Sequence, residues 1–138
     1  MSHFLPVAFR NRALTPPEIN QLSPVALAYI GDAVFELYVR GHCLFPPKRP
    51  HDYHRHVVDC VRAEQQAHYL VEYLWPQLSE QELKIVKRGR NASPGPSRKM
   101  SAKIYQQATS FEALLGYLYL TNQTRLWELL DSLPIVFY

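Results

Sequence analysis

Two carboxylates lie in segments that otherwise have the composition of a buried helix face. Asp32 occurs within ALAYIGDAVFEL (26–37), and Glu112 occurs within ATSFEALLGYL (108–118). An unpaired carboxylate in an apolar setting loses hydration worth several kcal/mol or takes up a proton. A cation bound between the two side chains would remove that cost. The pattern therefore favours a metal site formed by Asp32 and Glu112.

Small residues flank both acids and permit two helix backbones to approach closely. They are Ala28, Gly31 and Ala33 near Asp32, and Ala108, Ala113 and Gly116 near Glu112. Two hard oxygen ligands without a nearby cysteine or histidine suit Mg²⁺, for which Mn²⁺ can substitute. The alternative from spacing alone is that each acid faces solvent at the rim of a helical bundle or pairs with an arginine.

Two further polar residues lie about one helical turn from the acids. Glu36 follows Asp32 by four residues, and Thr109 precedes Glu112 by three. Both are placed to support a metal site from outside its coordination sphere. A solvated or arginine-paired position is the simpler interpretation of Glu36, and a hydroxyl-to-backbone bond within the helix is an equally good interpretation of Thr109. Glu64 is interpreted as a rim residue.

Positive charge is concentrated in one segment of the chain. Between Leu83 and Phe111 there are seven of the fifteen Lys and Arg residues and no Asp or Glu. Such a cluster would attract a polyanion. We expect a flexible Gly/Pro-containing loop over 87–99 to contact RNA through Lys87, Arg88, Arg90, Arg98 and Lys99. The alternative is an ordinary solvated surface.

The histidines and cysteines are weaker candidates for a metal site. His51, His54 and His56 have the spacing His-x-x-His-x-His, which cannot place all three on one helix face. We therefore prefer a surface or RNA-backbone role to a zinc site. Cys43 and Cys60 lack metal-type spacing and are interpreted as free thiols.

The elements that position these residues are predicted to be helices. Cap residues and apolar spacings indicate a short helix opening at Thr15 and longer helices over about 24–41, 52–75, 101–122 and 124–132. A further helix starts at Ser79 and is stopped by Gly89, with a loop over 90–100. Prolines predict a stiff connection over 45–50. The stripe expected to be buried in the second helix is Leu27, Ile30, Val34 and Leu37. The fold class is all-α, with one domain over 1–138.

Composition excludes several classes of protein. The chain has 138 residues, of which 47% are hydrophobic and 20% charged, as is typical of one globular domain. No apolar run approaches the ~20 residues that span a bilayer, and the N-terminus lacks a secretory pattern. We therefore expect a soluble cytoplasmic protein with no membrane partner.

The segments around both acids resemble the two signature motifs of the ribonuclease III family. LAYIGDAV (27–34) is similar to the helix with the core Leu-Gly-Asp-Ala, and FEALLG (111–116) is similar to the second acidic motif. The motifs occur in the family order, and the resemblance covers about 16–133. It implies an all-helical endonuclease that cleaves double-stranded RNA by metal-assisted hydrolysis, with Asp32 and Glu112 as catalytic metal ligands.

Three departures from the long-form family resemble its compact branch, Mini-ribonuclease III. Ala28 and Thr109 stand where long-form members carry further acids, and no residues remain for a double-stranded RNA-binding domain. GDAVFELYVR (31–40) and RGRNA (88–92) are also similar to that branch. The resemblance implies a homodimer, a substrate in precursor 23S ribosomal RNA of the large subunit, and location in the cytoplasm, or in the plastid stroma for a plant source.

Two other functions are consistent with the residues. Loss of two family carboxylates is what a non-catalytic RNA-binding or ribosome-associated protein on this fold would show. Retention of Asp32 and Glu112 in intact motifs favours the enzyme. A helical protein-interaction module with surface acids is a third interpretation, and it predicts no salt-sensitive binding of RNA.

Overall fold

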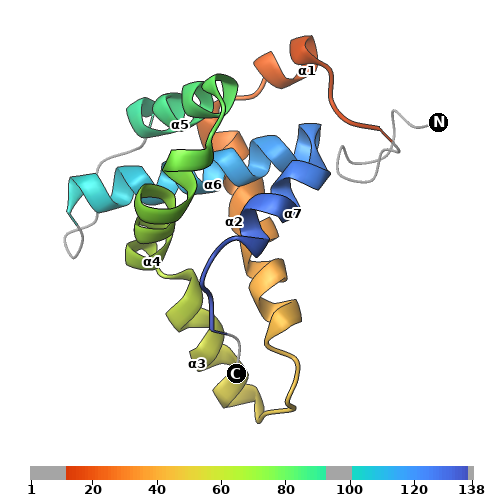
Figure 1. The fold of residues 1–138 in the computed structure, drawn as a ribbon, viewed down its shortest axis with the longest axis vertical. Coiled ribbons are helices and arrows are strands. Elements are labelled where there is room, and N and C mark those ends of the chain that lie inside the picture. Colours follow the sequence, from red (N-terminus) through yellow and green to blue (C-terminus); the bar gives the residue numbers. More distant parts are fainter. Residues whose placement is uncertain (1–11, 93–100, 137–138) are drawn as a thin grey trace.

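The computed structural model describes residues 12–92 and 101–136, and every regular element in these ranges is helical (Figure 1). The helices are α1 (Pro16–Asn20), α2 (Pro24–His42), α3 (Pro50–Val61), α4 (Ala63–His68), α5 (Glu80–Ala92), α6 (Ala102–Thr121) and α7 (Gln123–Asp131). A π-helical turn (Tyr69–Leu74) and a 3₁₀ turn (Trp75–Gln77) connect α4 to α5. The all-α prediction is confirmed. Within the described ranges, no helix is long and apolar enough to cross a membrane.

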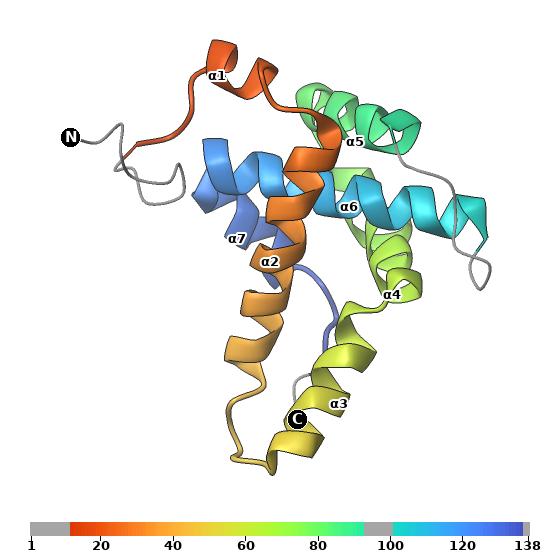
Figure 2. The same cartoon turned by 180° about the vertical axis from the view of Figure 1, so that it is seen from behind.

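The two helices that carry the acids, α2 and α6, cross in the middle of the molecule. The views from opposite sides in Figures 1 and 2 show α2 on one side of α6 and α4 on the other. The lower part of α2 continues beyond the crossing, where α3 runs back alongside it. The centre of the fold is therefore a helix crossing that the remaining helices support.

The hydrophobic core forms around α6. Phe111, Leu114 and Leu115 are fully buried, and the ring of Phe111 meets that of Phe35 edge-to-face with 4.9 Å between centroids. Burial of each such side chain contributes about 1.5–3 kcal/mol. Buried residues from α3, the π-helical turn and α7 complete the main cluster and include Val57, Cys60, Leu70, Leu74, Leu126, Leu129 and Leu130. Packing from several sides fixes the position of α6 and of Glu112 within it.

Four of the predicted helix starts, at Thr15, Ser23, Ser79 and Ser101, are confirmed by their capping hydrogen bonds. The hydroxyls of Ser23 and Ser101 each accept from the backbone N–H three residues later, at 3.1 Å. These bonds satisfy donors that a helix leaves open at its first turn. Reciprocal capping boxes join Thr15 with Glu18 and Ser79 with Glu82.

The prediction of one continuous helix over 52–75 is wrong. Arg62 has φ −58° and ψ 151°, which separates α3 from α4. The side-chain amide of Gln66 donates to the carbonyl of Val61 at 3.0 Å, so a group within α4 satisfies the end of α3. No glycine or proline marks this break. Val71, in the π-helical turn that follows α4, is 42% exposed.

The predicted stop at Gly89 is also wrong, because α5 continues to Ala92. A Cβ on Gly89 would lie 3.1 Å from the Cα of Ser110 and 3.2 Å from the Cβ of Ala113. Gly89 therefore permits close packing of α5 on α6 and does not end the helix. Residues 90–92 of the expected loop are helical, and 93–100 lie outside the described residues.

Leu37 corrects the predicted buried stripe of α2, because it is 73% exposed. The buried residues of α2 are instead Leu27, Ala28, Gly31, Val34, Phe35 and Val39. The first two belong to a cluster that includes α5, whereas Val34, Phe35 and Val39 pack with residues of α3 and α7. The buried face thus turns along the helix as its packing partners change.

Candidate active site

Asp32 and Glu112 lie where α2 crosses α6, and two glycines set the closeness of that crossing. A Cβ on Gly31 would overlap the carbonyl oxygen of Glu112, and a Cβ on Gly116 would overlap the carbonyl oxygen of Leu27. The two backbones are therefore in direct contact. This is the close approach that the small residues around both acids predict.

The carboxyl groups of Asp32 and Glu112 lie near enough for each to act on the pKa of the other. Asp32 is exposed, whereas Glu112 is half-buried. Burial raises the pKa of Glu112 to about 8, and the charge of Asp32 and the hydrogen bond to it add to this effect. Partial loss of water around its carboxyl group and the charge of Glu36 raise the pKa of Asp32, while hydrogen bonding with Glu112 lowers it. Near neutral pH the pair therefore holds one proton between its two carboxyl groups.

This pair of oxygen donors fits a divalent cation that takes few protein ligands. Two adjacent carboxylates repel each other when both are charged, and a bound cation offsets that repulsion. Across 12–92 and 101–136, no group of three or more His, Cys, Asp or Glu side chains is arranged to hold a metal ion. Mg²⁺ commonly binds one or two carboxylates and fills its other positions with water and substrate phosphate. The residues present fit that mode.

Glu36 and Thr109 lie beside the acids but have partners of their own. The guanidinium of Arg40 donates to Glu36 at 2.6 Å, which is the arginine-paired position considered for it. The spacing of an acid four residues before a base is that of a helical ion pair. Thr109 donates its hydroxyl to the carbonyl of Tyr105 at 3.0 Å, as one of its two interpretations predicts.

The basic residues Lys87, Arg88 and Arg90 lie on helix α5, not on the expected loop, and all three are exposed. Arg98 and Lys99 lie outside the described residues. Lys87 and Arg90 line a groove together with Ser110 of α6. Because helix residues two apart point about 200° apart, this groove opens on the side of α6 away from Glu112. The structure therefore does not bring Lys87 and Arg90 together with the acids.

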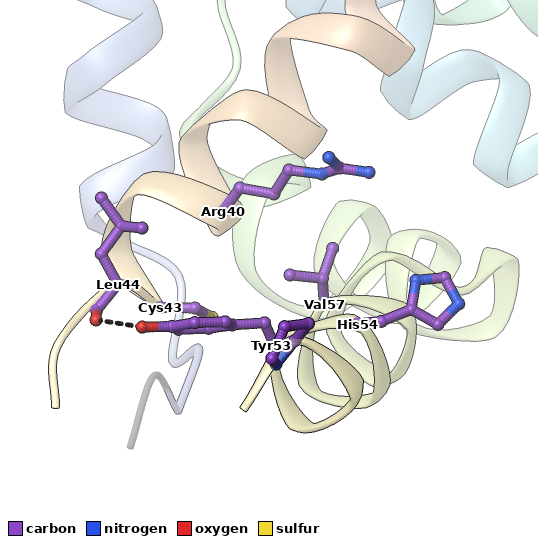
Figure 3. Close-up of a pocket in the computed structure, with 7 residues that line it drawn as sticks. Arg40, Cys43, Leu44, Tyr53, His54 and Val57 are labelled. Atoms are coloured by element: carbon purple, nitrogen blue, oxygen red, sulfur yellow. Dashed lines mark hydrogen bonds between the residues drawn. The ribbon is translucent and has the colours of Figure 1, made fainter. Parts of the chain in front are cut away.

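A second cavity, of about 300 Å³, lies between the end of α2 and α3 (Figure 3). His54 lines it, whereas the ring of His56 hydrogen-bonds the carbonyl of Val136 at 2.7 Å. The two histidines therefore lie in different surroundings. Cys43 and Cys60 are free, as predicted, and both are buried.

The fold and the site together define a class of protein. Residues 25–123 match the model of the Ribonuclease III domain family. A crystal structure of a protein from Fusobacterium nucleatum is similar, with a TM-score of 0.74 and 26% sequence identity over 82% of this chain and 92% of that one. The molecule is thus built on a ribonuclease III domain.

Similar curated proteins narrow this class. A Mini-ribonuclease 3 from Synechocystis sp. is 58% identical over 119 residues, which are 86% of this chain and 82% of the relative. Another from Thermosynechococcus vestitus is 54% identical over 122 residues, 87% of this chain and 80% of the relative. A third, from Clostridium tetani, is 35% identical over 133 residues, 94% and 87% of the two chains.

The chain belongs to the Mini-ribonuclease 3 branch of the ribonuclease III family. This membership confirms the family resemblance of the motifs around Asp32 and Glu112. It makes the protein an endoribonuclease that cleaves RNA. The enzyme is therefore favoured over both the non-catalytic RNA-binding protein and the interaction module.

Proposed function

We propose that the protein cleaves double-stranded RNA by metal-assisted hydrolysis, with Asp32 and Glu112 as catalytic metal ligands. The observation that carries this proposal is the close crossing of α2 and α6 at Gly31 and Gly116, where the carboxyl groups of Asp32 and Glu112 lie near enough for each to act on the pKa of the other. A pair of adjacent acids is costly in the free protein, and that cost favours binding of Mg²⁺ or Mn²⁺. When bound, the cation would lower the pKa of a water and neutralise charge on the scissile phosphate.

The protein's own groups hold and orient this site. Glu112 lies half-buried and gives up the shared proton when the pair becomes fully charged, while the exposed Asp32 faces the substrate side. Glu36 adds negative charge near Asp32, and its ion pair with Arg40 holds it along α2. With only two protein carboxylates, water and RNA oxygens would complete the coordination. We therefore expect weak metal binding without RNA, and in-line attack that leaves a 5′-phosphate and a 3′-hydroxyl.

Basic side chains support an RNA duplex as the substrate. A-form RNA is contacted mainly through its phosphates and 2′-hydroxyls. Lys87, Arg88 and Arg90 are exposed on α5, and Arg98 and Lys99 follow them in the sequence. We propose that all five contact RNA, so that affinity falls steeply as salt rises.

Family membership supports three further parts of the proposal. The protein is a homodimer, its substrate is precursor 23S ribosomal RNA, and it acts in the cytoplasm, or in the plastid stroma for a plant source. Analytical ultracentrifugation of the full chain tests the proposed homodimer. A species with the mass of a single chain would contradict it.

Incubation of the protein with duplex RNA and Mg²⁺ tests the proposed reaction. The wild type should cut within the duplex, and Asp32→Asn should not, although its circular dichroism and thermal unfolding match the wild type. Asp59→Asn is the matched control, since Asp59 is exposed on α3 and should leave the rate unchanged. Salt-sensitive binding without cleavage by any of these proteins would favour the non-catalytic alternative.

A further inference from the structure

A groove beside α5 combines an apolar floor with an aromatic side chain. It has a volume of about 290 Å³ and lies between the π-helical turn, α5 and α6. Leu70 and Val86 are buried in it, whereas Val71 and Trp75 are 42% and 41% exposed. The indole of Trp75 therefore offers solvent an apolar surface next to a hollow.

Two cations line the same groove from α5, namely Lys87 and Arg90. Neither forms an ion pair with any residue in 12–92 or 101–136, whereas Arg12, Arg40 and Arg125 are paired with Glu18, Glu36 and Glu82. The sequence from Leu83 to Phe111 also contains no acid. The groove therefore favours a ligand that carries negative charge beside a flat or apolar part.

The lining matches the parts of one nucleotide. An exposed indole can stack on a base, the cations suit its phosphate, and the amide of Gln107, which also lines the groove, can donate to and accept from a base edge. The volume of the groove is near the lower end of the ~300–1,000 Å³ of small-ligand sites. It therefore suits one nucleotide and not a helix of a partner protein. The cavity in Figure 3 is of similar size, but its Arg40 is already paired with Glu36.

Bases within a duplex are stacked and paired, so only an unpaired base can enter this groove. The groove opens on the side of α6 away from Glu112, as the positions of Ser110 and Glu112 require. A helix with its side chains is about 10–12 Å across, and a stacked strand advances about 3.4 Å per nucleotide. A strand that leaves the duplex near the acids would reach the groove within about four or five nucleotides.

We infer that this groove binds one unpaired nucleotide on a single-stranded flank of the RNA, between Trp75 and the cations Lys87 and Arg90. The inference rests on the proposed function, because it assumes that duplex RNA is held near Asp32 and Glu112. It assigns the enzyme a preference for duplexes with overhangs.

The two tryptophans of the chain, Trp75 and Trp127, allow a direct test. Trp127→Phe leaves Trp75 as the only indole, and Trp75→Phe is the matched control that leaves Trp127, which stacks near Tyr38. Each variant is titrated in EDTA, so that the RNA stays intact. The ligand is one duplex, either blunt or with a single-stranded overhang of about five nucleotides, the length at which a stacked strand reaches the groove. The overhang should quench Trp75 and leave Trp127 unchanged, and the blunt duplex should quench neither.

Affinity measurements on the same two duplexes complete the test. The wild type should bind the overhang duplex about tenfold more tightly than the blunt one, within the range of base–aromatic stacking. Trp75→Leu should lose this difference and Trp75→Phe should keep most of it, while circular dichroism verifies folding. Replacement of both Lys87 and Arg90 by glutamine should also reduce it.

Two results would overturn the inference. One is equal affinity for both duplexes without quenching of Trp75, and the other is equal quenching by polyglutamate, which would indicate an acidic protein segment as the ligand. Cleavage of the blunt duplex by the wild type with Mg²⁺ is scored separately. If the blunt duplex is cut and the overhang has no effect, the inference about the groove is refuted and the proposed function stands. If neither duplex is cut, the proposed function is refuted.

Discussion

Substitution of Gly31 by alanine should force α2 and α6 apart and separate the two acids. The added Cβ would overlap the carbonyl oxygen of Glu112 and lie 2.9 Å from the backbone nitrogen of Gly116. Backbone atoms cannot rotate aside as a flexible side chain can, so the helices must shift. Asp32 is the next residue along α2, and its carboxyl group would move with the helix.

The free-energy change follows from two opposing effects. Overpacking of a tight contact costs about 1–3 kcal/mol, and alanine regains about 1 kcal/mol over glycine in a helix. Because the obstruction is backbone, we expect the upper end of the cost and a net loss of about 2 kcal/mol in the free energy of unfolding. At about 4 °C per kcal/mol for a domain of this size, Tm should fall by about 8 °C.

Gly41→Ala is the matched control on the same helix, because nothing lies within 4 Å of a Cβ at Gly41. It should raise Tm slightly through helix propensity alone. Thermal unfolding followed by circular dichroism measures both variants, and cleavage of duplex RNA below Tm measures the site. A shift of about 1 Å at reacting groups can cost about 100-fold in rate, so Gly31→Ala should cut at least tenfold more slowly. Equal stability and equal rates for the two variants would refute the reasoning.

Three further predictions concern individual side chains. Glu112→Gln should abolish cleavage without lowering Tm at neutral pH, because it removes one of two adjacent acids; a loss of folding measured by circular dichroism would contradict this. Glu82 is buried, which raises its pKa, but hydrogen bonds from Arg125 and Ser79 outweigh burial and leave that pKa below its ordinary value of 4.5. The stabilising effect of the Glu82 carboxylate is therefore complete above that value and is lost as pH falls through the lowered pKa. Glu82→Gln should cost about 3 kcal/mol of unfolding free energy at pH 7 and progressively less in acid, as urea unfolding at each pH would measure. A cost that stays constant with pH would contradict this prediction. Arg88→Gln should reduce the salt dependence of binding to duplex RNA by about one unit in a plot of log affinity against log salt, and an unchanged slope would exclude a phosphate contact.

The closeness of the two acids was predictable from sequence, because small residues at a helix crossing leave room for backbone contact. Gly31 and Gly116 flank the acids in the sequence and contact the opposite backbone in the fold. The helix starts were equally predictable, since a capping hydrogen bond depends on residues within one turn, as at Ser101.

Features that depend on contacts between different helices were not predictable in the same way. The break at Arg62 is stabilised by a side chain from the following helix, Gln66, and no glycine or proline precedes it. Gly89 resembles a helix stop until the neighbouring Ser110 explains why a side chain is excluded there. The groove at Trp75 needs three separate segments, and the sequence contains no local signal for it.

Anomalous diffraction from crystals soaked in Mn²⁺ at high concentration tests the central claim most directly. A single strong peak should lie within about 2.2 Å of oxygens from both Asp32 and Glu112, and crystals of Asp32→Asn should lose it. A peak that contacts neither carboxylate, or none at all at saturating Mn²⁺, would contradict the assignment of these two acids as metal ligands.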